Sequence, residues 1–102
     1  MKNLVMIVNA SVQQDLADCL RGLGQVQEFT FSHVEGHGHR AEPDHFLSAR
    51  DKVVGYTPRV RVDILLQDDD VEVVLDAVRS DVPGITGRCM YWVADVARWG
   101  EL

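Results

Sequence analysis

RVRVDILLQ, the stretch at residues 59–67, decides the fold class because its apolar and polar side chains alternate. Successive side chains of a β-strand point to opposite faces of a sheet, so this alternation predicts a strand with one buried face. The apolar residues of that face are Val60, Val62, Ile64 and Leu66. The residues expected on the opposite face are Arg59, Arg61 and Asp63. The pattern therefore predicts a sheet with one covered face and one charged face.

Three further stretches have the composition of strands. LVMIV at residues 4–8 is a short apolar run, as expected for a strand in the middle of a sheet. VQEFTFSHV at 26–34 alternates and is rich in aromatic and β-branched residues, which puts its two phenylalanines and His33 on one face. CMYWVADV at 89–96 predicts the last strand. The aromatic residues expected to pack in the core or in a subunit interface are Tyr91, Trp92 and Trp99.

Two helices separate these strands, one after the first strand and one after the third. Ser11 forms a capping-box pattern with Gln14 that predicts a helix start, and Gly24 offers the stop. The apolar residues at helical spacing between them are Val12, Leu16, Cys19, Leu20 and Leu23. Asp69 predicts the cap of the second helix, and Pro83–Gly84 predicts its end. The apolar stripe of that helix consists of Val71, Val74, Leu75, Val78 and Val82.

The predicted order of elements is βαββαβ, which is the order of a ferredoxin-like α+β fold. In that fold two βαβ units interlock into a four-stranded antiparallel sheet with two helices on one face. A chain of 102 residues suits one modest core, so residues 1–102 are expected to form a single domain. The second face of the sheet would stay uncovered, and such a face commonly packs against another subunit. A homo-oligomer is therefore expected.

Charge and cysteine content exclude several classes of protein. The formal net charge of −6 argues against a nucleic-acid partner, because such binding depends on many Lys and Arg contacts to phosphates. Cys19 and Cys89 form no CxxC pair, so neither a disulfide framework nor a thiolate zinc site is predicted, and both are expected in the core. The opening MKNLVMIVNA contains too short an apolar run for a signal peptide or a membrane span. A cytoplasmic protein without membrane insertion is expected.

The connection between the second and third predicted strands, at about residues 35–58, is far longer than a hairpin needs. Connections of this length in small domains are usually functional or disordered. All four histidines lie in it or at its start: His33, His37, His39 and His45. Half of the ten basic residues also lie in it or directly after it. An anion is therefore expected to be attracted to this part of the chain.

The residues VEGHGHR at 34–40 resemble the loop base of the PII signalling superfamily, where a V-x-G-x-G motif ends the second strand and opens the T-loop. The βαββαβ order and the position of the loop match that superfamily over essentially the whole chain. The resemblance is strongest to uncharacterised PII-like proteins whose genes lie beside heavy-metal efflux transporters of the RND class. It implies a homotrimer that binds nucleotide in the clefts between subunits. It also implies that the loop contacts a protein partner, and a membrane efflux transporter is the partner it favours.

Two glycine-containing turns are predicted to bind an anion or a nucleotide. Gly36 and Gly38 give the loop base backbone freedom, so that main-chain N–H groups can approach an anion, with His37 and Arg40 beside them. The turn PGITGR at 83–88 resembles the B-loop of the superfamily, which holds nucleotide phosphates. Its candidate binding residues are Thr86, Gly87 and Arg88. Arg40 stands where the nitrogen regulators have a glutamine, so sensing of 2-oxoglutarate is not predicted.

A divalent transition metal is the alternative ligand predicted for the loop. His37 and His39 are two residues apart, so in an extended segment both imidazoles point the same way, and His33, Glu35 or His45 would complete the site. Imidazole ligands suit zinc, copper, nickel or cobalt, and the sequence does not choose among them. A solvated loop that merely contains histidines is the other interpretation, and both stay open.

The functional hypothesis is a PII-like regulatory protein that binds an adenine nucleotide or a transition metal and signals through its loop to a protein partner. The alternative is a metal buffer similar to the CutA copper-tolerance proteins, without nucleotide binding. An enzyme is not expected, because no Ser or Cys lies in a nucleophile motif and the acids and histidines have no spacing that requires acid–base chemistry. NASVQQ at 9–14 also lacks the phosphate loop of the acylphosphatases, which share the βαββαβ order.

Overall fold

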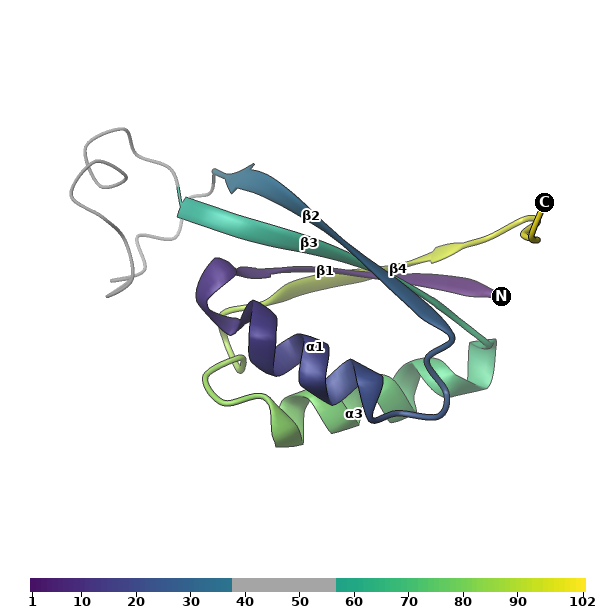
Figure 1. Ribbon diagram of the computed structural model, residues 1–102, viewed down its shortest axis with the longest axis horizontal. Helices are drawn as coiled ribbons and strands as arrows, with labels where there is room; N and C mark the ends of the chain where they lie inside the picture. Colours follow the sequence, from purple (N-terminus) through teal and green to yellow (C-terminus); the bar gives the residue numbers. More distant parts are fainter. Residues whose placement is uncertain (38–56) are drawn as a thin grey trace.

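The computed structural model describes residues 1–37 and 57–102, and its strands and helices follow the predicted order (Figure 1). The strands are β1 (Lys2–Asn9), β2 (Glu28–Gly36), β3 (Thr57–Leu66) and β4 (Met90–Asp95). The helices are α1 (Gln13–Arg21) and α3 (Val71–Asp81), preceded by the short 3₁₀ helices η1 (Ala10–Val12) and η2 (Asp68–Asp70). The ferredoxin-like α+β prediction is confirmed for this part of the chain.

The described strands form one four-stranded antiparallel sheet in the order β2-β3-β1-β4. β1 lies in the middle and pairs with β3 from Lys2↔Leu66 to Asn9↔Arg59. On its other side it pairs with β4, where Ile7↔Met90 is the last pair. Figure 1 shows α1 and α3 together on one face of this sheet, which leaves the second face without a helix in the described chain.

The core lies between this sheet and the two helices, and the predicted apolar positions form it. The four alternating residues of β3, from Val60 to Leu66, are at most 1% exposed. The buried residues of the helices are Leu16, Ala17 and Leu20 of α1 and Val71, Val74, Leu75 and Val78 of α3. Val82 and Ile85 close the core beyond the end of α3. No helix in residues 1–37 and 57–102 is long and apolar enough to cross a membrane.

The predicted helix caps are wrong, although the helices are present. The side chain of Asn9, rather than that of Ser11, caps the first turn: its Oδ1 accepts a hydrogen bond of 2.9 Å from the N–H of Ser11. Asp69 lies inside η2 and makes no cap, and α1 ends at Arg21 instead of running to Gly24. Both helices begin with a 3₁₀ turn, so the residue that caps depends on backbone geometry that a capping pattern does not contain.

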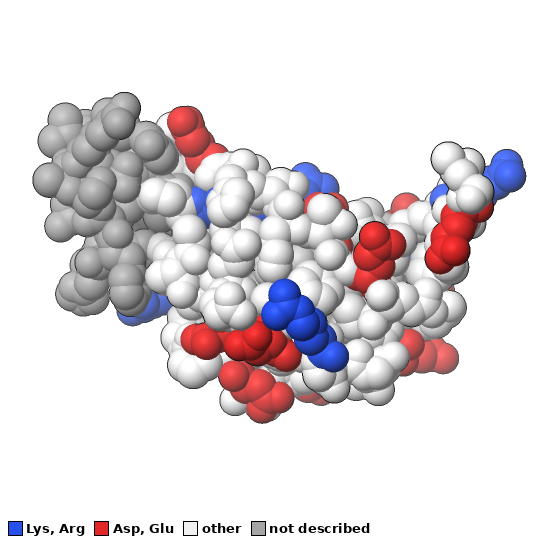
Figure 2. All heavy atoms as spheres, viewed as in Figure 1, with Lys and Arg blue, Asp and Glu red and all other residues white. Residues whose placement is uncertain are grey.

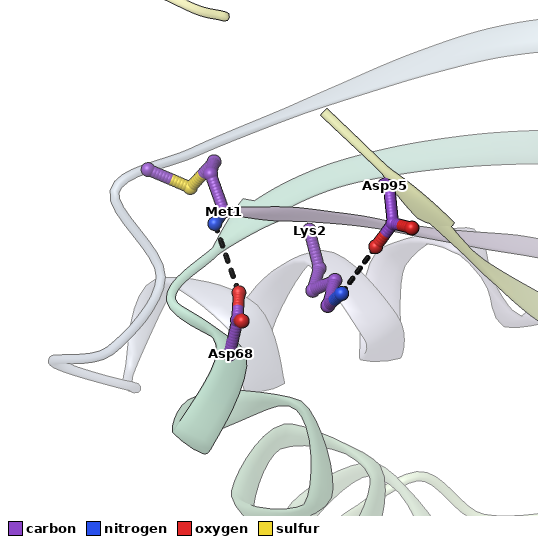
Figure 3. Close-up of polar contacts among 4 residues, drawn as sticks. All are labelled: Met1, Lys2, Asp68 and Asp95. Atoms are coloured by element: carbon purple, nitrogen blue, oxygen red, sulfur yellow. Dashed lines mark hydrogen bonds and ion pairs between the residues drawn. The ribbon is translucent and has the colours of Figure 1, made fainter. Parts of the chain in front are cut away.

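Two ion pairs join the beginning of β1 to elements that are distant in sequence (Figure 3). The amino group of Met1 lies 2.8 Å from a carboxylate oxygen of Asp68, which begins η2. Lys2 pairs with Asp95 at the end of β4, and this hydrogen bond raises the pKa of the Lys2 ammonium. The hydrogen bond from Met1 lowers the pKa of the Asp68 carboxyl. The aspartate of each pair is exposed, at 60% and 86%, so each pair adds little to the stability of the fold.

The predicted loop boundaries need correction. β2 begins at Glu28 rather than at residue 26 and continues through Gly36, while β3 already begins at Thr57. Glu35, Gly36 and Pro58 are therefore strand residues, paired as Glu35↔Pro58 and Gly36↔Thr57. The connection between β2 and β3 covers residues 37–56, and of these the structure describes only His37. β2 and β3 stay paired beyond the residues whose composition predicts a strand, because hydrogen bonds to the partner strand keep these residues extended.

Candidate functional site

The predicted site residues that the structure describes gather at one end of the sheet. β1 and β2 end there and β3 and β4 begin there, as Figure 1 shows. Gly36 lies on edge strand β2, and the turn at 83–88 leads into the opposite edge strand β4. Since strands lie about 4.8 Å apart, three strand spacings of roughly 14 Å separate these two places. The loop root and the turn therefore share an end of the sheet but do not touch within one chain.

Gly36 serves close packing rather than backbone freedom. Among the described glycines, only Gly84 and Gly87 have positive φ, so the expectation of unusual backbone geometry at Gly36 is wrong. Instead, the Arg59 side chain crosses it: a Cβ on Gly36 would lie 2.2 Å from both Cδ and Nε of Arg59. The Nε of Arg59 is buried and finds no hydrogen-bond partner in the described chain. A guanidinium with an unsatisfied donor therefore lies over the root of the connection.

Replacing Gly36 by alanine is expected to destabilise the fold by about 1 kcal/mol or more, because Arg59 must leave its position. In an Arg59→Ala background the same replacement should cost nearly nothing. Gly24→Ala is the matched control, since no atom lies within 4 Å of a Cβ built there. Urea unfolding of the four variants measures the coupling. An equal loss with and without Arg59 would contradict the packing explanation.

The histidines of the predicted metal site are only partly described. His37 Nε2 lies 3.3 Å from Glu35 Oε2, and both side chains are 65% exposed. His33 is exposed on β2. In residues 1–37 and 57–102, no three His, Cys, Asp or Glu side chains are close enough to hold a metal ion. Gly38, His39, Arg40 and His45 lie outside the described residues. Two of the seven predicted anion-binding residues and two of the four histidines therefore have no described position, and both sites remain predictions.

The turn at 83–88 separates its predicted binding residues instead of combining them. Its shape comes from two glycines, Gly84 at φ 75° and Gly87 at φ 78°. Thr86 and Gly87 line an apolar hollow of about 140 Å³ between α3 and the start of β4. Arg88 lines a different cleft of about 270 Å³, which we call the polar cleft because four of its seven lining residues are polar or charged. Within one chain the three residues thus line two different hollows, and their binding of phosphate stays a prediction.

The polar cleft contains residues that the sequence interpretation did not assign to a binding site. They are Asn9, Ser11 and Asp15, which lie at the end of β1, in η1 and in α1. The only sequence signal was their position directly after a buried strand. Because β1 and β4 are antiparallel neighbours, that position lies at the same end of the sheet as the turn before β4.

Both cysteines lie at the margin of the core rather than inside it. Cys19 and Cys89 are free thiols and partly buried against the core cluster. Burial raises the pKa of the Cys89 thiol to about 11, and burial also raises that of Cys19. Thiolate is the reactive form, so Cys89 is a poor nucleophile at neutral pH.

The helix-free face of the sheet carries a connected polar group. The guanidinium of Arg61 donates to both carboxylate oxygens of Asp63, at 3.1 and 3.0 Å, and Asn3 Nδ2 donates to Asp63 at 3.1 Å. The hydrogen bonds from Arg61 are the main reason why the pKa of the Asp63 carboxyl is lowered, and the hydrogen bond from Asn3 lowers it further. Arg61 also lies 5.7 Å from the ring centroid of Trp92. The Oδ1 of Asn3 is buried without a partner in the described chain.

Strand β4 carries four of the seven exposed large hydrophobic residues of the described chain. All six of its residues are exposed, and β1 is its only neighbour among the described strands. We call Met90, Tyr91, Trp92 and Val93 the β4 surface; Met90 is 57% exposed and Trp92 40%. Tyr91 and Trp92 are thus not core residues, so the prediction that they pack in the core is wrong. Their packing in a subunit interface stays a prediction. Acidic side chains, in contrast, gather over the helices (Figure 2).

The whole chain, residues 1–102, matches the sequence profile of the family described as "Protein of unknown function (DUF3240)". The chain belongs to the DUF3240 family. The crystal structure of a DUF3240 family protein from Shewanella baltica superposes with a TM-score of 0.77 and 19% identity, covering 99% of this chain and 94% of that one. This likeness confirms the fold of the DUF3240 chain.

The DUF3240 chain is also similar to two named nitrogen regulatory proteins. It is 25% identical to GlnK of Escherichia coli K12 over 99 residues, which cover 96% of this chain and 88% of GlnK. It is 26% identical to nitrogen regulatory protein P-II of Rhizobium meliloti over 88 residues, 86% of this chain and 76% of that protein. These similarities support a PII-like regulatory family for the DUF3240 chain, in agreement with the resemblance at VEGHGHR.

Proposed function

We propose that this DUF3240 protein is a cytoplasmic PII-like regulator that forms a homotrimer and acts by binding rather than by catalysis. It binds a small ligand, an adenine nucleotide or a transition metal, in clefts between subunits. The connection between β2 and β3 then reports the ligand to a protein partner. A membrane efflux transporter is the partner that the resemblance to the efflux-associated proteins favours.

The observation that carries this proposal is the β4 surface. An edge strand with exposed aromatic and aliphatic side chains is a pairing site for another chain, and soluble monomers rarely keep such a surface open. The orphaned Oδ1 of Asn3 and the stacked Arg61 and Trp92 lie on the adjoining sheet face. In the proposed assembly a second copy of the chain covers the β4 surface and these groups of the adjoining face.

Assembly also supplies the ligand site that a single chain lacks. The loop root at Gly36 lies at the β2 edge and the turn at 83–88 at the β4 edge, both at the same end of the sheet. A closed ring in which the β4 edge of one chain meets the β2 edge of the next brings a root beside a turn. The unsatisfied Nε of Arg59 supports an anionic ligand at this junction.

A metal buffer similar to the CutA proteins is the second candidate, and the Glu35–His37 pair favours it. A carboxylate and an imidazole 3.3 Å apart are two suitable ligands for zinc or copper. In this alternative the metal is the cargo and nucleotides have no effect.

A thermal-shift panel of ATP, ADP, AMP and the divalent ions of zinc, nickel, cobalt and copper tests the proposal. A ligand of the native state at 100 times its Kd stabilises by about 2.7 kcal/mol, which is a shift of several degrees. His37→Ala/His39→Ala separates the candidates. The regulator keeps its nucleotide response in this variant, whereas the buffer never shows one and loses its metal response. No shift with any compound of the panel would contradict both.

A further inference from the structure

The polar cleft of about 270 Å³ lies within a single chain, between the connection after β1 and the turn before β4. Its polar residues are Asn9, Ser11, Asp15 and Arg88. Val12, Pro83 and Gly84 complete its walls. The nucleotide and metal sites proposed above do not use Asn9, Ser11 or Asp15.

The cleft is lined by two opposite charges, those of Arg88 and Asp15, that no described side chain neutralises. Neither Arg88 nor Asp15 makes a side-chain hydrogen bond or an ion pair with another described residue, or with each other. Four other described basic side chains each lie against an aspartate: Lys2 with Asp95, Arg21 with Asp18, Arg61 with Asp63 and Arg79 with Asp76. Asp18, on the same helix as Asp15, is also engaged by Gln14 at 3.0 Å. The cleft therefore offers a ligand one guanidinium and one carboxylate that no other described side chain engages.

The backbone of both walls is fixed. On one side, buried Ile85 anchors the turn, and its carbonyl accepts a 3.0 Å hydrogen bond from the N–H of Arg88. Gly84 allows the left-handed backbone that this turn requires. On the other side, the Asn9 side chain holds the N–H of Ser11 at 2.9 Å. Since the backbone that carries these side chains is already held, a ligand has only the side chains to order.

We propose that this cleft binds a small zwitterion of the free α-amino acid class. The guanidinium of Arg88 only donates hydrogen bonds and suits the ligand carboxylate. The ionised carboxylate of Asp15 only accepts and suits the ligand ammonium, and the Ser11 hydroxyl can do either. A polyphosphate would be repelled by Asp15, and a simple anion would leave Asp15 without a role. The site lies inside one chain, so it does not depend on the proposed trimer.

Thermal shift and titration calorimetry of the full chain with the standard amino acids test this proposal. At least one amino acid should bind, whereas its 2-hydroxy acid, which lacks the ammonium, and its amine, which lacks the carboxylate, should not. Arg88→Gln and Asp15→Asn should each weaken binding roughly 10-fold or more, since each removes a charge-assisted hydrogen bond. The matched controls Arg98→Gln and Asp18→Asn remove the same charges outside the cleft and should leave the affinity unchanged.

Three results would overturn the proposal. One is that no standard amino acid binds. Another is equal binding of the 2-hydroxy acid, which means an anion site without a role for Asp15. The third is an equal effect of Asp15→Asn and Asp18→Asn. The nucleotide and metal responses, measured in Asp15→Asn as well, should persist there, so the failure of one proposal is distinguishable from the failure of the other.

Discussion

Replacing Leu20 by alanine is expected to destabilise the protein by about 2–5 kcal/mol, a large part of the 5–15 kcal/mol typical of a small domain. Leu20 is fully buried in α1, where the helix packs against the core cluster. The substitution removes apolar contacts and leaves a cavity that a close-packed core refills only in part. Equilibrium unfolding in urea measures the loss at constant protein concentration, because the proposed association would make the apparent stability depend on concentration.

Val73→Ala is the matched control for this prediction. Val73 lies on α3 and is 44% exposed, so its truncation should change the free energy of unfolding by no more than about 0.5 kcal/mol. If both substitutions had similar effects, the core would not lie between the helices and the sheet as described.

Replacing Met90 by glutamate is expected to dissociate the proposed homotrimer while leaving the fold of the single chain intact. Met90 is 57% exposed, so a charge there costs the isolated chain little. Once a second copy covers the β4 surface, the same carboxylate is buried without a partner. That costs about 3 kcal/mol or more, which weakens association by roughly 100-fold or more. Light scattering coupled to size exclusion measures the mass, and circular dichroism checks the fold.

Val73→Glu introduces the same charge on an exposed helix position away from the β4 surface and should leave the mass unchanged. Dissociation by both variants would show that net charge, rather than the β4 surface, controls assembly. An unchanged mass of Met90→Glu would place the interface elsewhere.

The sequence predicted the fold well because its signals are local and periodic. The alternation in RVRVDILLQ and the helical stripe from Val71 to Val82 each identify a buried face without knowledge of the rest of the chain. The ends of the elements were predicted less well. β2 continues to Gly36 because it keeps pairing with β3, and the cap of the first turn moved to Asn9 because a 3₁₀ turn precedes the helix.

The candidate site was predicted only in outline, because its geometry is non-local. The glycine at 36 was noticed, but its actual constraint is the Arg59 side chain that the register places over it. Thr86 and Arg88 are near neighbours in sequence, yet they line two different hollows. Asp15 and Arg88 line one cleft although they lie far apart in the chain, and only the pairing of β1 with β4 brings them together.

The mass of the unmodified protein in solution, measured by sedimentation equilibrium over a range of micromolar concentrations, tests the central claim most directly. The account predicts three times the chain mass of 11.4 kDa, because in the proposed trimer three copies cover each other's β4 surfaces and form the ligand clefts between them. A mass of 11.4 kDa at every concentration would contradict it, since the loop root and the turn would then never meet.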